Sequence, residues 1–416
     1  APRTREWLHD AIDDEVAFDI CLKSLARGKA AGPDNVPNEV LQALPDAGKQ
    51  AIHNMMRIMW ATGLTPSGWK ESSTRLLYKH KGTARQLLYF RRIGLENTVY
   101  KIWTRMVTYA MADRAERLDM ISSSQAGFRN KRTCAHQIEM MLMALEDAHL
   151  TKQDIYLLQA DMTEAFDTID HDKLLMILFD LGFPTDAIEV VKDLYTGAST
   201  KIQTPYGPTS SIPFERGTIQ GDSLSPFLFV IYLEPLLRWL KAERAGYMVG
   251  ALAPQGLDLQ AQYQISDITY ADDVNILTGG QHGLQNLKHQ ANKLSAYATW
   301  GHLIVSNTKT TVTGALHGSV PSQPYDEQRL RTQLTNTIKI QDKPITYHTP
   351  RSPFRHLGVQ LTMDLNFKHQ FKDTMQKLRK QITNLKWSYA STAQKQRVIE
   401  TCIRPAISYG FAAAPY

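Results

Sequence analysis

The stretch "QISDITYADDVNILTGG" (residues 264–280) places two adjacent carboxylates, Asp272 and Asp273, inside apolar sequence that favours β-structure. Residues such as Ile268 and Val274 predict one strand or a pair of strands around them. Like charges this close repel each other, and burying them without a counter-charge is costly. The sequence therefore predicts a two-strand unit whose acidic tip is stabilised by some other group.

The composition is that of an ordinary globular protein, with 43% hydrophobic and 21% charged residues among 416. This length allows two or three packed subdomains. The three cysteines are far apart in sequence, which argues against a zinc knuckle or a disulfide framework and fits a reducing compartment. The most apolar run, "PFLFVIYLEPLL" (226–237), contains Glu234 and is too short to span a bilayer. The chain shows no signal-peptide pattern, and it begins with Ala1 instead of Met, so we expect a piece of a longer protein.

The net charge of +6 is unevenly distributed along the chain. Residues 65–105 and residues 366–404 each contain nine Lys or Arg and two acidic residues, so the remainder of the chain is acidic. The two basic segments are either solvated helical faces or two surfaces that hold a phosphate backbone. Their position on either side of an acidic centre favours the second interpretation.

Hydrophobic periodicity and turn residues predict a mixture of helices and strands. The "DIYLLQADM" stretch (154–162) predicts a buried strand, and residues 200–217 predict a hairpin. Residues 241–264 are expected to be a loop or insertion, and residues 314–336 are expected to be a loop. The predicted helices cover residues 6–27, 38–60, 95–118, 133–149, 171–184, 223–242, 284–303 and 367–385.

A third carboxylate, Asp161, follows the apolar strand in "LLQADMTEAF" (157–166). Strand ends and hairpin tips can direct several carboxylates towards one point. Mg²⁺ binds carboxylate oxygens together with water and substrate phosphates, so a divalent cation would offset the repulsion. The alternatives are a simple Asp-Asp turn and a solvated strand end, and these residues alone do not exclude them.

Together with further stretches along the chain, these motifs resemble the reverse transcriptase domain of non-LTR (LINE-type) retrotransposons. The matching stretches run in the family's order over nearly the whole chain, and a "YADD" downstream of the other motifs is highly specific. The stretches are "GKAAGPDNVPNEVL" (28–41), "LLYKHKG" (76–82), "FRRIGLENTVYKIWTRM" (90–106), "SSSQAGFR" (122–129), "QADMTEAFDTIDHDKLL" (159–175), "RGTIQGDSLSPFLF" (216–229), "YADDVNIL" (270–277), "GHLIVSNTKT" (301–310), "FRHLGVQL" (354–361) and "IRPAISYG" (403–410).

The resemblance implies an α+β right-hand polymerase fold with fingers, a palm with an antiparallel sheet, and a helical thumb. Fingers with an N-terminal extension would cover residues 1–154, and the palm would cover 155–360 with an interleaved finger segment and an insertion near 241–264. A truncated thumb would cover residues 361–416.

The resemblance also implies a two-metal active site. Asp161, Asp272 and Asp273 would be the catalytic and metal-binding carboxylates, and the Met162 backbone carbonyl would add a ligand. Two Mg²⁺ ions would be bound, with Mn²⁺ able to substitute.

The implied dNTP site contains Lys79, Arg91, Phe166, Gln220, Gly221 and Lys309. Phe166 resembles the aromatic gate that excludes a 2′-OH, and the alternative is a core aromatic residue. The loop of Gln220 and Gly221 would approach the nascent base pair, and the alternative is a helix cap built on Asp222 or Ser223. Lys79, Arg91 and Lys309 would bind the triphosphate. Where the family usually has Pro, this chain has Arg92, which leaves the choice between Arg91 and Arg92 open.

The implied template and primer contacts form two groups. Gln125, Gly127, Phe128 and Arg129 resemble a template-contacting turn, with a local structural ion pair as the alternative for Arg129. Phe354, His356, Leu357 and Gly358 resemble a primer grip, with a strand packed on the palm as the alternative.

The implied function is RNA-directed DNA synthesis in target-primed reverse transcription. It requires an RNA template, a DNA or RNA primer and dNTPs, and no membrane. The implied location is intracellular and mainly nuclear, with a cytoplasmic ribonucleoprotein phase. Two rival functions are a catalytically silent nucleic-acid-binding scaffold and an RNA-synthesising polymerase. The three carboxylates argue against the scaffold, and Phe166 argues against the RNA polymerase.

Overall fold

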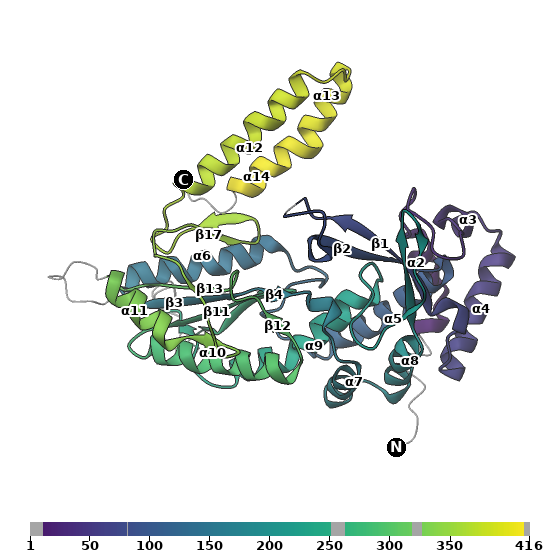
Figure 1. Cartoon of the computed structure of the whole chain (residues 1–416), viewed down its shortest axis with the longest axis horizontal. Helices are drawn as coiled ribbons and strands as arrows, with labels where there is room; N and C mark the ends of the chain where they lie inside the picture. The colour runs from purple at the N-terminus through teal and green to yellow at the C-terminus, as the bar shows by residue number, and fades with distance from the viewer. Residues whose placement is uncertain (1–10, 81, 251–262, 318–326, 412–416) are drawn as a thin grey trace. The chain divides into compact units, whose positions relative to one another are not determined.

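A computed structural model describes residues 11–80, 82–250, 263–317 and 327–411, and the chain divides into two compact units (Figure 1). Each unit is assembled from separate segments of the chain, so the predicted boundaries at residues 154 and 360 remain predictions. Unit 1 comprises Ala1–Ser122, Glu164–Pro235 and Gly301–Leu303; unit 2 comprises Ser123–Thr163, Leu236–Trp300 and Ile304–Tyr416.

Unit 1 contains a sheet with strand order β2-β1-β5-β6, in which β7 also pairs with β5. Strand β1 is antiparallel to β2 and parallel to β5. The strands are β1 (Glu71–Tyr78), β2 (Phe90–Leu95), β5 (Ser199–Thr204), β6 (Gly207–Pro208) and β7 (Ile212–Pro213). The helices are α2 (Glu15–Lys23), α3 (Asn38–Gln42), α4 (Asp46–Thr62), α5 (Thr98–Arg117), α7 (His171–Asp180), α8 (Thr185–Tyr195) and α9 (Leu224–Lys241), which continues into unit 2, with short 3-10 turns η1 (Ser67–Trp69), η2 (Leu87–Tyr89) and η3 (Ala165–Asp167).

Two of the predicted N-terminal helices are divided in the structure. Within the predicted helix 6–27, Asp14 has an extended backbone and its side chain accepts a hydrogen bond from the Val16 N–H, so it begins the new helix α2. The predicted helix 38–60 is in fact α3 and α4, because Pro45 favours an extended residue before it and then precedes the first turn of α4. Residues 6–10 lie outside the described residues.

Two buried carboxylates, Glu96 and Asp222, lie near each other in unit 1. Both oxygens of Glu96 and Oδ1 of Asp222 are buried without a hydrogen-bond partner among the described residues. Burial and the Asp222 charge raise the pKa of Glu96 well above its ordinary value. Burial also raises the pKa of Asp222 to about 6. Hydrogen bonds from Thr104 and from the backbone of Leu224 and Ser223 lower this pKa, but by less than burial raises it. Both carboxyls therefore bind a proton more readily than a solvated carboxyl does.

The raised pKa of Asp222 predicts a specific pH dependence of stability. Because an unfolded Asp titrates near 3.8 and this one near 6, the folded state binds more protons between those values. Stability therefore falls as the pH rises from 3.8 to 6. We expect the free energy of unfolding of Asp222→Asn, relative to wild type, to rise by roughly 2 kcal/mol from pH 4 to pH 7. Denaturant unfolding of both proteins at several pH values checks this, and a difference that does not change with pH would contradict it.

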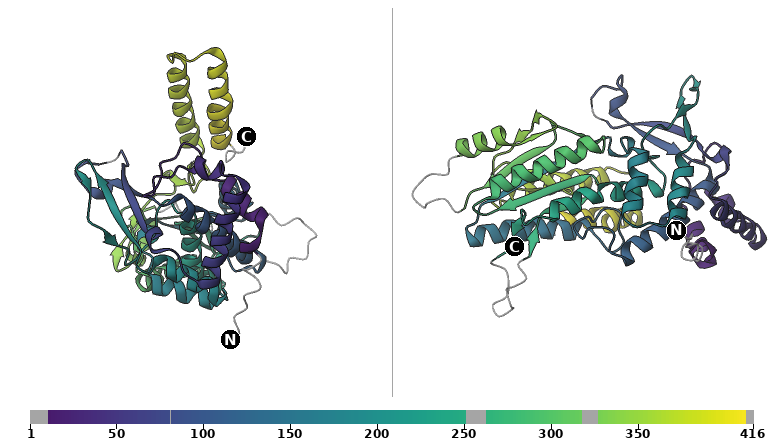
Figure 2. Two further views of the ribbon diagram at one scale, coloured as in Figure 1. Left: turned by 90° about the vertical axis from the view of Figure 1, so that its right-hand side faces the viewer. Right: turned by 90° about the horizontal axis from the view of Figure 1, so that it is seen from below.

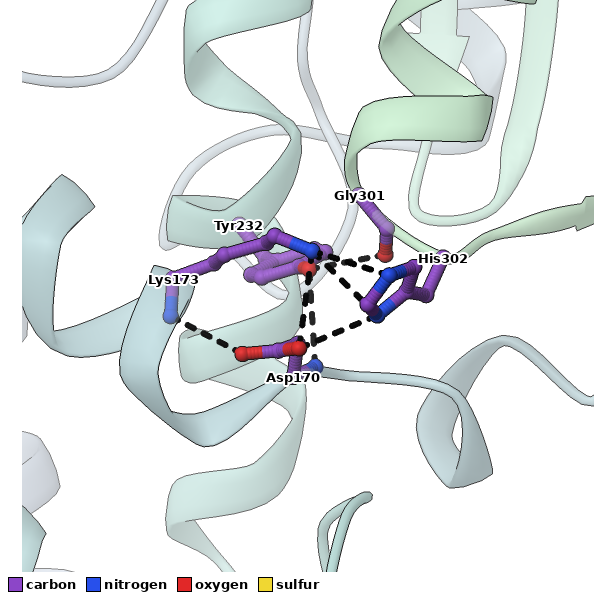
Figure 3. Close-up of polar contacts among 5 residues, drawn as sticks. All are labelled: Asp170, Lys173, Tyr232, Gly301 and His302. Atoms are coloured by element: carbon purple, nitrogen blue, oxygen red, sulfur yellow. Dashed lines mark hydrogen bonds and ion pairs between the residues drawn. The ribbon is translucent and has the colours of Figure 1, made fainter.

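A polar cluster attaches the short Gly301–Leu303 segment to the helices of unit 1 (Figure 3). The Asp170 carboxylate lies 3.0 Å from Nδ1 of His302 and 3.5 Å from Nζ of Lys173. The Tyr232 hydroxyl donates to the Gly301 carbonyl at 2.8 Å and accepts from the Asp170 N–H at 3.4 Å. Asp170 also caps α7 through the N–H of Lys173 at 3.1 Å. The cluster therefore fixes the loop after α10 (Gly283–Trp300) to α7 and α9.

Unit 2 is built on a sheet with strand order β10-β11-β3-β13-β16. Its strands are antiparallel, as predicted for the palm sheet, except that β13 and β16 are parallel. These strands are β3 (Ile155–Ala160), β10 (Asp267–Tyr270), β11 (Asp273–Gly279), β13 (Thr311–Ala315) and β16 (Thr346–Tyr347); short pairs are formed by β4 (Met162–Thr163) with β12 (Ile304–Val305), β8 (Tyr247–Met248) with β9 (Gln264–Ile265), β14 (Lys339–Ile340) with β15 (Lys343–Pro344), and β17 (Phe354–His356) with β18 (Val359–Leu361).

The central strand β3 is buried on both faces. Ile155 and Leu157 pack in one core cluster with residues of α6 (Cys134–Thr151) and of the β17–β18 hairpin. Helix α10 packs against β3 and β11 from the other side of the sheet (Figure 1). Because side chains alternate along a strand, the residues two and four positions after Leu157 face the α6 side of the sheet. Those residues are Gln159 and Asp161.

The C-terminal part of unit 2 is helical. The amphipathic helix predicted over residues 367–385 is α12 (Lys368–Lys386), and it lies beside α14 (Arg404–Phe411) (Figures 1 and 2). Helix α13 (Thr392–Val398) and the π-turn η4 (Ile399–Ile403) connect them. The apolar stripe of α12 is partly open to solvent, since Phe371 is 55% exposed and Ile382 is 50% exposed.

The structure corrects one loop prediction. The segment 314–336 was expected to be a loop, but β13 extends to Ala315 and helix α11 (Glu327–Thr337) covers its end. Among the side chains of α11 that the structure describes, Leu330 and Leu334 are buried; two apolar residues four positions apart give a weak periodic signal. Residues 318–326 lie outside the described residues, and so do residues 251–262 of the predicted insertion, which is flanked by the paired strands β8 and β9. No helix in the described ranges combines the length and the apolar content needed to cross a membrane.

Candidate active site

The three predicted carboxylates lie at neighbouring positions in unit 2. Asp161 directly follows β3, and Asp273 is the first residue of β11. These strands pair with Val274 opposite Ala160, so the next position along β3 brings Asp161 beside Asp273. Asp272 lies in the turn between β10 and β11, where Tyr270 pairs with Asp273. The paired strand ends therefore explain why two carboxylates interrupt an apolar stretch.

The turn that carries Asp272 is strained and is supported by Gln125. Ala271 has φ +55°, a left-handed conformation that is unfavourable for a residue with a Cβ. Oε1 of Gln125 accepts hydrogen bonds from the N–H of Ala271 and of Gly127, each at 2.8 Å. Its Nε2 donates to the Ala271 carbonyl at 3.2 Å. The Gln125 side chain thus fixes both polar groups of the strained residue.

These contacts correct the prediction that Gln125 contacts the template. Its side chain is fully buried and its polar atoms are used by the turn, so it acts as a support for Asp272. Gly127 is required for close packing, because a Cβ there would lie 2.3 Å from the Ala271 nitrogen. Nη1 of Arg129 donates to the Gln125 carbonyl at 3.0 Å, a local structural contact. Phe128 is 56% exposed, so a template contact by Phe128 remains a prediction.

The electrostatics of the carboxylates show the repulsion that the sequence predicted. Burial raises the pKa of Asp273 to about 6, and the Asp272 and Asp161 charges act in the same direction. Burial also raises the pKa of Asp272, with a further contribution from Asp161. Lys309 opposes both shifts, and its Nζ lies 3.0 Å from Oδ1 of Asp161. The positive charge of Lys309 therefore offsets only part of the repulsion among the three carboxylates, because the pKa values of Asp272 and Asp273 stay raised.

This arrangement fits a bound divalent cation that is completed by other ligands. In the described residues, no three His, Cys, Asp or Glu side chains are grouped so that they could hold a metal ion by themselves. The carboxylates of Asp161 and Asp272 nevertheless provide hard oxygen donors, and Mg²⁺ is usually bound by one or two carboxylates plus water and substrate phosphates. The Met162 side chain is 4% exposed, so only its backbone carbonyl is suited to the predicted role.

Two of the three carboxylates, those of Asp161 and Asp273, line a cavity of about 340 Å³ in unit 2. Its walls combine acidic, basic and amide groups, which suits a charged, hydrogen-bonding ligand. The lining residues include Asp161, Asp273, Gln159, Asn275, Lys309, Arg355 and the hairpin residues Phe354, His356 and Leu357.

The lining residues Gln159, Asn275 and Arg355 were absent from the sequence-based prediction. Nε2 of Gln159 donates to Oδ1 of Asn275 at 3.0 Å and to the Arg355 carbonyl at 3.3 Å. Arg355 lowers the pKa of Asp273, so its charge acts at the carboxylates. Gln159 and Asn275 lie two positions from Asp161 and Asp273, so the alternation of strand side chains was a signal that could have found them.

The predicted primer grip is the β17–β18 hairpin, and only part of it is accessible. Phe354 and His356 are each 2% exposed, and Nε2 of His356 lies 3.3 Å from the Gln137 carbonyl. Burial lowers the pKa of His356 to about 4, so its ring is neutral at pH 7. Phe354 and His356 pack inwards, Arg355 is exposed, and Leu357 is partly buried against the core, so a primer grip built on this hairpin remains a prediction.

Five predicted dNTP-binding residues belong to unit 1. Gln220 and Gly221 lie against β2: the Gln220 carbonyl accepts from the Gly94 N–H at 2.7 Å, and a Cβ on Gly221 would lie 2.8 Å from the Gly94 carbonyl oxygen. Gly221 has φ +122°, which requires glycine. The buried Asp222 accepts from the N–H groups at the start of α9, so the predicted cap is present beside the predicted loop. The Phe166 ring is half-buried, with its centroid 5.2 Å from that of Phe229.

The structure separates the roles of Arg91 and Arg92. Nη2 of Arg92 lies 2.8 Å from Asp167 and 3.0 Å from Glu164, so its charge is already paired. Arg91 is exposed and points to the opposite face of β2, because adjacent residues of a strand alternate. Lys79 follows β1, and its N–H donates to the Tyr89 carbonyl at 2.8 Å. Arg91 is therefore the arginine that remains suited to a triphosphate.

We expect Arg91→Ala to raise the KM for dNTP by about tenfold, the loss of one charge-assisted hydrogen bond. The matched variant Arg92→Ala breaks a solvent-exposed ion pair within the protein. It should leave the KM for dNTP within about twofold, since exposed ion pairs contribute little to stability. Steady-state nucleotide incorporation by both variants measures the difference. A larger rise in the KM for Arg92→Ala than for Arg91→Ala would contradict the assignment.

Comparison with known proteins agrees with this geometry. Residues 80–361 match the family described as "Reverse transcriptase (RNA-dependent DNA polymerase)". The chain is 22% identical over 396 residues to "Probable RNA-directed DNA polymerase from transposon BS" of Drosophila melanogaster, covering 94% of this chain and 40% of the relative. It is 21% identical over 394 residues to "RNA-directed DNA polymerase from mobile element jockey" of the same species, with coverages of 94% and 40%.

A third relative is the "Retrovirus-related Pol polyprotein from type-1 retrotransposable element R2" of Nasonia vitripennis. It is 23% identical over 279 residues, covering 67% of this chain and 25% of the relative. The chain thus spans at most 40% of the length of these three relatives. The family match includes the Asp161, Asp272 and Asp273 positions and well over half of the 416 residues, and the chain belongs to the reverse transcriptase (RNA-dependent DNA polymerase) family.

Proposed function

We propose that this chain is the RNA-directed DNA polymerase part of a non-LTR retroelement protein. It extends a primer 3′-OH with dNTPs on an RNA template. The observation that best supports this function is that Asp161 lies beside the Asp272–Asp273 turn, where the ends of β3 and β11 pair. All three residues lie within the part of the chain that matches the family. The names of the relatives, which include RNA-directed DNA polymerases of mobile elements, support the same substrate class.

The proposed architecture follows the right-hand arrangement. The β1–β2–β5 sheet and helices α2 to α5 correspond to fingers, with β5 as the interleaved finger segment; the five-stranded sheet of unit 2 corresponds to the palm, and α12–α14 to the thumb. The basic segments 65–105 and 366–404 then belong to fingers and thumb, which suits binding to a phosphate backbone. The predicted domain ranges, 1–154, 155–360 and 361–416, are kept as part of this proposal.

In the proposed reaction the residues of the chain bind the metal ions, orient the substrates and neutralise the charge of the triphosphate. Asp161 and Asp272 would hold the metal, with Asp273 beside them and the Met162 carbonyl as a further ligand. Two Mg²⁺ ions, or Mn²⁺ in their place, would favour the ionised primer 3′-OH and neutralise the triphosphate. Lys309 and Arg91 supply cationic groups for the phosphates, and Lys309 exchanges its contact with Asp161 for one with the substrate. Positioning and electrostatics supply most of the rate.

The proposed setting is target-primed reverse transcription inside the cell, mainly in the nucleus, with a ribonucleoprotein phase in the cytoplasm. Its substrates are the RNA template, a DNA or RNA primer, and dNTPs. This setting rests on the resemblance to non-LTR retrotransposons and on the names of the relatives.

Primer extension on an RNA template tests the function against its two rivals. We expect wild type to incorporate dNTPs in preference to rNTPs, and Asp161→Ala to bind the same primer–template with little change while extending it poorly. Equal extension by wild type and Asp161→Ala, or binding without extension by wild type, would favour the silent scaffold. A preference for rNTPs would favour an RNA polymerase.

A further inference from the structure

The segment "IRPAISYG" (403–410) provides a contact that the proposed reaction has not yet used. Tyr409 on α14 donates its hydroxyl hydrogen to the carbonyl of Leu357, the first residue of the β17–β18 turn. The ring also lies along the second turn residue, because a Cβ built on Gly358 would be 3.6 Å from Cε1 of Tyr409. One thumb side chain therefore touches both residues of this turn.

The turn itself needs such support. Leu357 has φ +46° and Gly358 has φ +93°, the pair of left-handed conformations that a two-residue hairpin turn requires. This conformation is unfavourable for Leu357, which carries a Cβ. The Tyr409 hydroxyl satisfies the carbonyl of that strained residue.

Further contacts connect the hairpin to the carboxylate cavity and to α12. The Arg355 carbonyl accepts from Nε2 of Gln159, two residues before Asp161, and Arg355 lines the cavity with Asp273. On the other side, the Gln360 N–H donates to Oε1 of the buried Gln370 on α12 at 2.8 Å. The hairpin thus lies between the helices of the thumb and the wall of the active site.

A second contact of Tyr409 leads to the carboxylate turn. The Cys134 thiol at the start of α6 lies close enough to the hydroxyls of Tyr409 and of Tyr270, the residue at the end of β10, to act on both. Burial and Cys134 raise the pKa of Tyr409 to about 12, and Cys134 and burial raise the pKa of Tyr270. The Tyr409 phenol is therefore protonated at neutral pH, and its single hydroxyl hydrogen is donated to the Leu357 carbonyl.

We propose that Tyr409 is a positioning residue that fixes the Leu357–Gly358 turn relative to Tyr270 and the carboxylates, so that a primer end is seated at the correct distance. The inference rests on the proposed polymerase function. Tyr409 acts through the turn, not on the reacting atoms. Its removal should weaken primer placement without changing the chemistry of a correctly placed primer.

The test compares Tyr409→Phe with Tyr263→Phe, which removes the same hydroxyl from an exposed residue of unit 2 that lies outside both basic segments. We expect Tyr409→Phe to raise the KM for primer–template by about five- to tenfold, the value of one hydrogen bond. The kcat at saturating primer–template should stay within about twofold, and Tyr263→Phe should match wild type. Cys134→Ser, which keeps a hydrogen-bonding side chain, should have a smaller effect on this KM than Cys134→Ala.

The outcomes separate the two proposals. Absence of DNA synthesis by wild type would reject the polymerase function itself. An active wild type with an unchanged KM for primer–template in Tyr409→Phe would reject the positioning role. A lower thermal unfolding midpoint in Tyr409→Phe with unchanged KM would assign Tyr409 to stability alone and would also reject it.

Discussion

Asp272→Asn should reduce RNA-templated DNA synthesis by at least about 10³-fold, because it removes one of the two carboxylates that we propose bind the metal. Asn has nearly the same size and shape, and Gln125 supports the turn through the backbone of Ala271, so the local fold should persist. The loss of a negative charge also relieves repulsion with Asp161 and Asp273. The thermal unfolding midpoint of the variant should therefore not fall.

Single-turnover extension of a labelled primer by wild type and variant measures the effect. Asp364→Asn is the matched control, because Asp364 is exposed, lies in the same unit and is outside the carboxylate cavity. It should retain the wild-type rate. More than a tenth of the wild-type rate in Asp272→Asn would show that this carboxylate is not at the centre of the reaction.

Phe166→Ala should change the sugar selectivity of the enzyme. The ring is half-buried beside Phe229, and its partly exposed side is available to an incoming nucleotide. A ring at the position of a 2′-OH excludes ribose sterically, and shrinking it to a methyl group removes the clash. We expect the ratio of kcat/KM for rNTP to kcat/KM for dNTP to rise by about 100-fold.

Competition between a matched rNTP and dNTP on one template measures this ratio directly. Phe179→Ala is a suitable control, since Phe179 is 69% exposed on α7 in the same unit. It should leave the ratio unchanged. An unchanged ratio in Phe166→Ala would mean that the ring serves packing only, the alternative that its sequence pattern also allowed.

The strands of the active site were predictable because their sequence pattern is local. Apolar residues mark β3, β10 and β11, and the carboxylates are at the strand ends, where their position follows from the pattern itself. The alternation of apolar and polar residues in "FRHLGVQL" also predicts the orientation of the hairpin side chains. It places Arg355 on the face opposite to Phe354 and His356, whereas the resemblance to a primer grip pointed to Phe354 and His356, which are buried.

Other features depend on contacts between distant segments. The side-chain amide of Gln125 hydrogen-bonds to the backbone of Ala271, 146 positions later, and no local sequence pattern predicts that contact. The choice between Arg91 and Arg92 needed the ion pairs of Arg92 with Asp167 and Glu164. The division of residues 38–60, by contrast, had a local signal in Pro45, which the predicted continuous helix disregarded.

The most direct test of the account is the metal dependence of wild-type DNA synthesis on an RNA template. The carboxylates of Asp161, Asp272 and Asp273 lack sufficient positive charge within the protein, so the account predicts no incorporation of dNTPs in excess EDTA. Incorporation should return when Mg²⁺ is added back in excess. Equal synthesis with and without divalent cations, or none at any Mg²⁺ concentration by the folded protein, would contradict the account.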